Sequence, residues 1–201
     1  MLYRCGRKLK HPSNMKKSGF TLIELIVSIG IIAMVTGIFL ANYSSANRRT
    51  DLTMTSQKMV TDIHMAQNYA LGLARYGLSG STNVPIGGWG IHFDLQNYGN
   101  NKYIIFADDN GNTVYDEGSE NVLANGAQVT TLPNNITISA INMLGNSSNK
   151  ADITFVPPDP LTIITGSLAT SSLVDIVLKD TKTNAIKTVR INFLGLAEVM
   201  D

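Results

Sequence analysis

The residue types needed for acid–base, thiol or metal chemistry are few in this 201-residue sequence and lie far apart. Its three histidines are His11, His64 and His92, and its one cysteine is Cys5. A single cysteine excludes an intramolecular disulfide and any zinc or iron–sulfur site built from cysteines. The sequence also lacks a Gly-x-Ser-x-Gly elbow, a His-Glu-x-x-His motif and a phosphate-binding loop. We therefore expect neither an enzyme nor a bound cofactor, and we name no catalytic residue.

Acidic and amide side chains alternate in residues 108–120, in a pattern that is typical of calcium-binding loops. The candidate oxygen ligands are Asp108, Asn110, Asn112 and Asp116. The register then fails, because Ser119 stands where a bidentate glutamate is expected, Glu120 comes one residue too late, and no glycine follows Asn112. Asp, Asn and Gly also make ordinary turns. We interpret the segment as a solvated hairpin loop and name no metal ligand, with calcium binding as the open alternative.

The most unusual titratable residue is Glu24, the one charged residue between positions 20 and 40. A carboxylate within hydrocarbon is costly unless it is paired, so an acid in such an apolar run is a candidate functional residue. The alternative is a tolerated glutamate that reaches back to the lipid headgroups from one turn inside the run.

The apolar run around Glu24 has the length of a membrane-spanning helix. Its 21 residues, FTLIELIVSIGIIAMVTGIFL, correspond to about 31 Å of helix, against a hydrocarbon core of about 30 Å. Six basic residues precede the run and no acidic residue does. Because basic residues stay on the cytoplasmic side, we expect a single pass, with the N-terminus cytoplasmic and residues 41–201 across the membrane.

Three ordinary explanations of such an N-terminus fit poorly. A secretory signal peptide has an apolar core of about 7–15 residues and a small-x-small cleavage site, and no convincing site precedes the polar stretch NYSSANRR. A plain signal anchor accounts for the hydropathy but gives no reason for Glu24. A lipoprotein signal carries its cysteine after the apolar core, whereas Cys5 precedes it.

Residues 16–25, KKSGFTLIEL, resemble the class III signal of type IV prepilins and pseudopilins. The resemblance implies that a prepilin peptidase cuts between Gly19 and Phe20 and methylates the new N-terminal residue, Phe20. It also implies that Glu24 pairs with the N-terminal amine of a neighbouring subunit during filament assembly. Residues 1–19 are then a basic leader that is cleaved.

Beyond the membrane run, the sequence predicts the rest of one long helix and then a β-rich domain. No proline occurs between positions 42 and 77, and apolar or small residues recur there at steps of three and four. This stripe comprises Met59, Ile63, Ala66, Ala70, Leu73 and Gly77, with Gly77 as the C-cap and His64 beside the stripe as a helix-surface or packing residue.

Alternating patterns after the helix predict strands at 89–94, 103–106, 129–132, 136–141, 153–156, 161–164, 174–179 and 187–193. Polar loops are expected at 78–88 and 144–150. The predicted fold class is α+β, with a long N-terminal helix packed on an antiparallel β-sheet domain. The helix spans the membrane over 20–41 and is amphipathic over 42–77, and the β-rich domain covers 78–201.

Three shorter motifs resemble the GspH/FimT group of minor pseudopilins. They begin with MAQ at 65–67 and continue through Arg75, followed by GGWGIHF at 87–93 and RINFLG at 190–195. The resemblance implies the pilin-like lollipop, a long helix on a small sheet domain. DNA-binding members of the group carry Gly-Arg-x-Arg in the last hairpin, where this chain has Gly195-Leu196-Ala197-Glu198. Without those arginines we expect no nucleic-acid partner.

These features predict a structural subunit rather than an enzyme. We expect a minor pseudopilin of a type II secretion pseudopilus or a related type IV filament, located in the cytoplasmic (inner) membrane. Its expected partners are a prepilin peptidase, other pilins or pseudopilins, and membrane lipid. The alternatives are a type IV pilus or competence minor pilin that takes up DNA and, with less support, a signal-anchored hydrolase. The net charge of +1 combines six basic leader residues with an exported part that holds ten basic and fourteen acidic residues.

Overall fold

The computed structural model describes residues 19–77, 83–117, 120, 128–159, 161–167 and 170–200. The predicted leader, apart from Gly19, therefore lies outside the described residues. The chain divides into two units, residues 1–43 and 44–201, and one helix, α1 (Leu22–Leu71), contributes to both.

The first unit contains an apolar stretch of α1. Its segment Leu22–Leu40 has a mean hydropathy of 2.4, is not buried within the structure, and is long enough to cross a membrane. Large apolar side chains such as Leu25, Ile32 and Phe39 are all exposed. Apolar side chains exposed all around a helix are suited to lipid rather than to water. We call residues 22–40 the apolar half of α1.

The later part of α1 belongs to the second unit and carries the predicted stripe. Met59, Ile63, Ala66 and Ala70 are buried, and Leu52 extends the same face by two turns. We call residues 49–71 the packed half of α1. His64 lies beside the stripe on the exposed side, where its Nδ1 is 2.7 Å from Gln67 Oε1, so the prediction of a surface position is confirmed.

The helix ends at Leu71, six residues before the predicted cap at Gly77. Ala74 N donates to Tyr69 O and Leu73 N donates to Ala70 O, which is the hydrogen-bond pattern of a Schellman motif. Leu73 adopts the left-handed conformation there, with φ of 48°, and its side chain is exposed. The prediction was wrong because the cap uses a leucine, which gives no sequence signal. Trp89 Nε1 donates to Ala74 O at 3.0 Å and holds the chain just after this cap.

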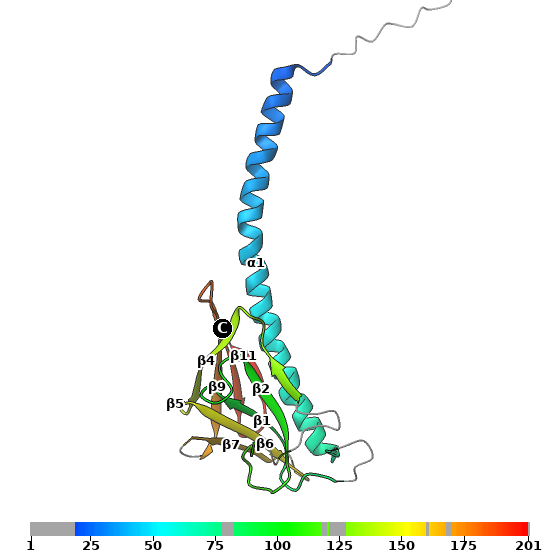
Figure 1. Cartoon of the computed structure of the whole chain (residues 1–201), viewed down its shortest axis with the longest axis vertical. Helices are drawn as coiled ribbons and strands as arrows, with labels where there is room; N and C mark the ends of the chain where they lie inside the picture. Colours follow the sequence, from blue (N-terminus) through cyan, green and yellow to red (C-terminus); the bar gives the residue numbers. More distant parts are fainter. Residues whose placement is uncertain are drawn as a thin grey trace, which may run out of the picture. The chain divides into compact units, whose positions relative to one another are not determined.

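Eleven strands in the described residues form two antiparallel sheets (Figure 1). The six-stranded sheet has the order β3-β2-β1-β6-β7-β8, and the five-stranded sheet has the order β11-β10-β9-β4-β5. The strands are β1 (Gly88–Asp94), β2 (Lys102–Asp108), β3 (Gln128–Thr131), β4 (Ile136–Met143), β5 (Asn146–Ser148), β6 (Lys150–Val156), β7 (Leu161–Gly166), β8 (Thr170–Ser171), β9 (Leu173–Asp180), β10 (Ile186–Asn192) and β11 (Ala197–Met200).

One hydrophobic core joins the packed half of α1 to both sheets. In the five-stranded sheet, buried and half-buried residues alternate along β9, so one face packs inward. In the six-stranded sheet, β1 is buried along its whole length. Trp89, Ile91 and Phe93 point into the core, whereas His92 lies on the opposite face, which is therefore covered as well.

The helix and the antiparallel sheets are consistent with the predicted α+β class. All eight predicted strands are present, with bounds that differ by at most three residues. Three strands were not predicted, namely β5, β8 and β11. The predicted loop at 144–150 is wrong in part, because Asn146–Ser148 pairs with the end of β4. β5 and β8 are short, polar edge strands, which lack the alternation that marks a half-buried strand.

Candidate functional site

The expected processing site lies in an exposed, non-helical segment just before α1. Gly19 and Phe20 precede the helix, and Phe20 is 80% exposed. A side chain added at Gly19 would meet no atom within 4 Å, so packing within this unit does not require the glycine. The peptide bond between Gly19 and Phe20 is accessible to an approaching enzyme.

Thr21 and Glu24 define where the helix begins. Glu24 N donates to Thr21 Oγ1 at 3.3 Å, and the Thr-x-x-Glu spacing is that of a capping box. Glu24 lies in the first turn, where the helix dipole favours an acid, and its side chain is exposed. The ion pairs found among the described residues do not include Glu24. Because the side chain is exposed, a cation from another molecule can reach its carboxylate.

A second group of polar residues forms the Asp108 loop, which we define as residues 108–117 together with Glu120. Asp108 Oδ1 accepts from Gly111 N and its Oδ2 accepts from Thr113 N, both at 2.7 Å. Asn110 and Asn112 each accept the N–H two residues ahead at 2.9 Å, which makes two successive Asx turns. Residues 110–112 are exposed, as a solvated loop requires, but residues 113–116 are half-buried.

Asp116 and Glu120 close the Asp108 loop. Asp116 Oδ2 accepts from Nδ2 of Asn110 and of Asn112, both at 2.7 Å, and Asp116 N donates to Glu120 Oε2 at 3.0 Å. Burial, followed by the charges of Asp108 and Asp116, raises the pKa of Glu120 to about 7, although the N–H of Asp116 opposes that shift. Across the described ranges, no three His, Cys, Asp or Glu side chains make a metal cluster on their own.

The loop covers a polar cluster on the outer face of the six-stranded sheet. His92 Nδ1 lies 2.6 Å from Asp152 Oδ1, and Lys150 Nζ lies 3.3 Å from Asp152 Oδ2. The ring of Tyr115 packs 4.7 Å from that of His92, and Tyr98 meets His92 edge-on at 5.5 Å. His92 is only 2% exposed, so this pair cannot reach a substrate in solution.

Sequence reasoning missed this cluster. His92 and Asp152 are 60 residues apart and meet because β1 and β6 pair with these two residues opposite each other. No local motif signals such a pairing.

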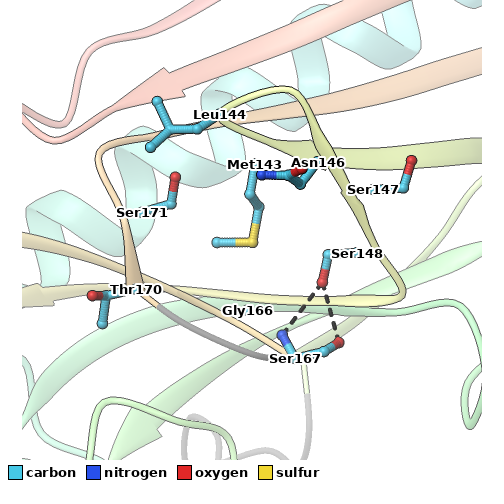
Figure 2. Close-up of a pocket in the computed structure, with 9 residues that line it drawn as sticks. All are labelled: Met143, Leu144, Asn146, Ser147, Ser148, Gly166, Ser167, Thr170 and Ser171. Atoms are coloured by element: carbon cyan, nitrogen blue, oxygen red, sulfur yellow. Dashed lines mark hydrogen bonds between the residues drawn. The ribbon is translucent and has the colours of Figure 1, made fainter.

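A pocket of about 330 Å³ lies between edge strands of the two sheets (Figure 2). Its lining comes from the end of β4, from β5 and from the β7–β8 hairpin, and it consists of serine, threonine, asparagine, glycine, Met143 and Leu144. Ser148 Oγ accepts from Ser167 N at 3.3 Å across it. Among the described lining residues there is no charged residue or histidine that could activate these hydroxyls.

The last hairpin presents apolar rather than basic side chains. Asn192 Oδ1 accepts from Leu194 N and Leu196 N, and Gln67 Nε2 of α1 donates to Gly195 O at 2.5 Å. Phe193, Leu194 and Leu196 are exposed. Arg190 in β10 forms a bidentate salt bridge with Asp175, in which Nε donates to Oδ1 at 2.8 Å and Nη2 donates to Oδ2 at 2.9 Å. Its guanidinium is therefore already paired within the domain.

The described residues form an α+β protein in which the exposed apolar half of α1 is long and apolar enough to cross a membrane. Residues 14–40 match the family model described as the prokaryotic N-terminal methylation motif. The match supports a type IV pilin-like protein that is processed by prepilin peptidase and assembles with other pilins. Proteins with this motif are generally structural. Searches of curated proteins and of solved structures found no match.

Proposed function

We propose that this chain is a minor pseudopilin, a structural subunit of a type II secretion pseudopilus or a related type IV filament. One observation carries the proposal: the signal KKSGFTLIE joins an exposed peptide bond, Gly19 to Phe20, to an apolar helix with a single acid in its first turn. The GspH/FimT-like motifs favour a minor subunit within that class.

In this proposal cleavage after Gly19 removes the basic leader and creates a cationic amine on Phe20. The amine lies at the end of the helix where Glu24 also lies, so each subunit carries one cation and one anion near the same membrane surface. A carboxylate and an amine from neighbouring subunits neutralise one another at much lower cost than either group alone in hydrocarbon. Glu24 thereby sets the register between neighbouring helices, and the domain supplies contacts specific to its place in the filament.

The processing step is tested by intact-mass and N-terminal analysis of the protein from cells with an active prepilin peptidase. We expect a chain that begins at Phe20 and carries one added methyl group. Gly19→Val should abolish cleavage, because a branched side chain fills the space that the peptidase must approach. Gly37→Val is the matched control, since an added side chain also meets nothing within 4 Å there. An uncleaved or unmethylated wild-type chain contradicts the proposal.

The assembly step is tested with Glu24→Gln, which keeps the shape of the side chain and removes its charge. We expect normal cleavage and membrane insertion but a loss of cross-linking to neighbouring subunits in the filament. Glu198→Gln, an exposed carboxylate in β11, is the control and should assemble normally. Equal cross-linking by both variants would contradict a role for the Glu24 charge in filament assembly.

A minor pilin that takes up DNA remains the competing function, and the last hairpin argues against it. The large apolar residues of its turn, Phe193, Leu194 and Leu196, are exposed, and Arg190 is paired with Asp175. DNA binding needs free cations against the phosphates and weakens steeply with salt. We expect no gel shift of duplex DNA, even at low salt. A salt-sensitive shift would favour DNA uptake over secretion.

A further inference from the structure

The Asp108 loop shares features with calcium-binding loops, and these features do not depend on the proposed role in a filament. In calcium loops, oxygen atoms come from positions 1, 3, 5, 7 and 9, with the main-chain carbonyl at position 7 and a glutamate near position 12. Counted from Asp108, the first five positions are occupied by Asp108, Asn110, Asn112, the carbonyl of Val114, and Asp116.

The conformation of this loop accounts for the missing glycine, which is one departure of the sequence from the calcium-loop pattern. The sixth position of a calcium loop is normally a glycine, because the chain must turn sharply there. Thr113 holds that position with φ of 65°, in the left-handed region that a β-branched residue rarely adopts. Its N–H donates to Asp108 Oδ2 at 2.7 Å, so the first residue of the loop ties down the sixth.

The placement of Glu120 accounts for the second departure from the pattern, the glutamate that comes one residue late. Its buried carboxylate is also independent evidence for a bound ligand. Although Glu120 comes one residue late, its Oε2 accepts from Asp116 N at 3.0 Å. The side chain is only 5% exposed, and Oε1 is buried with no hydrogen-bond partner. A buried carboxylate oxygen that lacks a donor is costly, and a bound cation compensates it.

We propose that the Asp108 loop binds one Ca²⁺ ion, with Asp108, Asn110, Asn112, Asp116 and Glu120 supplying side-chain oxygens and Val114 its carbonyl. Each asparagine Oδ1 accepts one N–H and retains a lone pair for the ion. The ion displaces the amide N–H groups that Asp116 now accepts. Oxygen-only ligands select Ca²⁺ over Zn²⁺, which prefers nitrogen and sulfur, and over Mg²⁺, which demands a tighter octahedron.

The three carboxylates do not form a ready-made metal cluster in the described ranges, so the ion has to draw their oxygens together when it binds. Amide and main-chain oxygens supply half of the ligands. We therefore expect weak binding, with a Kd on the order of 0.1–1 mM, as in extracellular calcium modules.

The test uses the full-length chain in detergent and follows thermal unfolding through the fluorescence of Trp89, its one tryptophan. With 10 mM CaCl₂ in place of chelator, we expect the Tm to rise by about 3–6 °C. The same concentration of MgCl₂ should give less than half of that shift. Glu120→Gln should remove the calcium shift, whereas Asp159→Asn, an exposed carboxylate in the β6–β7 turn, should retain it.

Terbium luminescence on the unmodified chain gives a readout that a folding defect cannot imitate. Tyr115 lies within the loop, so bound Tb³⁺ should emit on tyrosine excitation and be displaced by CaCl₂ but not by MgCl₂. A wild-type Tm that is unchanged by calcium, a calcium shift that survives Glu120→Gln, or the absence of sensitised terbium emission each overturns the proposal. None of these outcomes bears on cleavage after Gly19.

Discussion

The two halves of α1 are parts of one helix with opposite relations to their surroundings. The apolar half exposes large aliphatic side chains on every side, and the packed half buries one stripe of Met59, Ile63, Ala66 and Ala70. Continuous hydropathy marks the first and a period of three to four residues marks the second. The contrast shows that one continuous helix can be suited to lipid along one part and to packing against a protein domain along another. The residue composition of each part decides which surroundings it fits.

The acids of the two halves sharpen this contrast. Glu24 has an exposed carboxylate in the apolar half, outside the ion pairs of the described chain. Asp62 is buried in the packed half, where Lys58 Nζ and Tyr103 Oη both lie 2.6 Å from its Oδ2. An acid that is satisfied within its own domain holds that domain together. An exposed acid in a lipid-facing helix is suited to contact another molecule.

The largest difference between the halves is expected when a buried side chain is shortened. Ile63→Ala removes packing at a fully buried position and should cost about 2–5 kcal/mol in the free energy of unfolding of the domain. Ile32→Ala makes the same chemical change at an exposed position of the apolar half and should stay within about 0.5 kcal/mol. Denaturant unfolding followed by Trp89 fluorescence measures both variants. Equal losses of unfolding free energy in the two variants would contradict the distinction between a packed half and an apolar half.

The reverse test places a charge in each half. Ile31→Lys puts an ammonium in the middle of the apolar half, at a cost of about 3 kcal/mol for membrane insertion. Thr61→Lys puts the same charge at an exposed position of the packed half, where it meets water. Fractionation and alkaline extraction of membranes should recover less of the first variant and an unchanged amount of the second. Full insertion of Ile31→Lys would argue against the membrane span.

Much of this division could be predicted from the sequence, because each half has its own pattern. The apolar run, the buried stripe and eight strands all follow from hydropathy and periodicity. Features that depend on distant partners could not be predicted. His92, for example, meets Asp152 only through strand register, because the two residues are 60 positions apart. The helix end was misplaced because Leu73 takes a conformation that glycine usually adopts.

A change of pH is expected to act on the domain and not on the apolar half. Glu120 has a folded pKa of about 7 against an ordinary value of 4.5, so the folded chain keeps a proton that the unfolded chain has released. Stability therefore falls as the pH rises from about 4.5 to 7 and then levels off, by an amount on the order of 2 kcal/mol. In chelator, the Tm should be lower at pH 8 than at pH 5, and Glu120→Gln should flatten this difference. A pH-independent Tm in the wild type would show that the carboxyl is not buried.

The smallest effect tests how the packed half is tied to the sheet through Asp62. Burial and the neighbouring Asp62 raise the pKa of Tyr103, so its hydroxyl stays protonated and donates to the carboxylate. Tyr103→Phe removes that donor but leaves Lys58 and Thr130, which also contact Asp62 Oδ2, so the loss should be about 1 kcal/mol. Tyr43→Phe, at an exposed position of the first unit, should cost nothing measurable. A larger loss for Tyr103→Phe, above about 3 kcal/mol, would mean that Lys58 and Thr130 do not satisfy Asp62 and that the helix is held mainly by this one hydrogen bond.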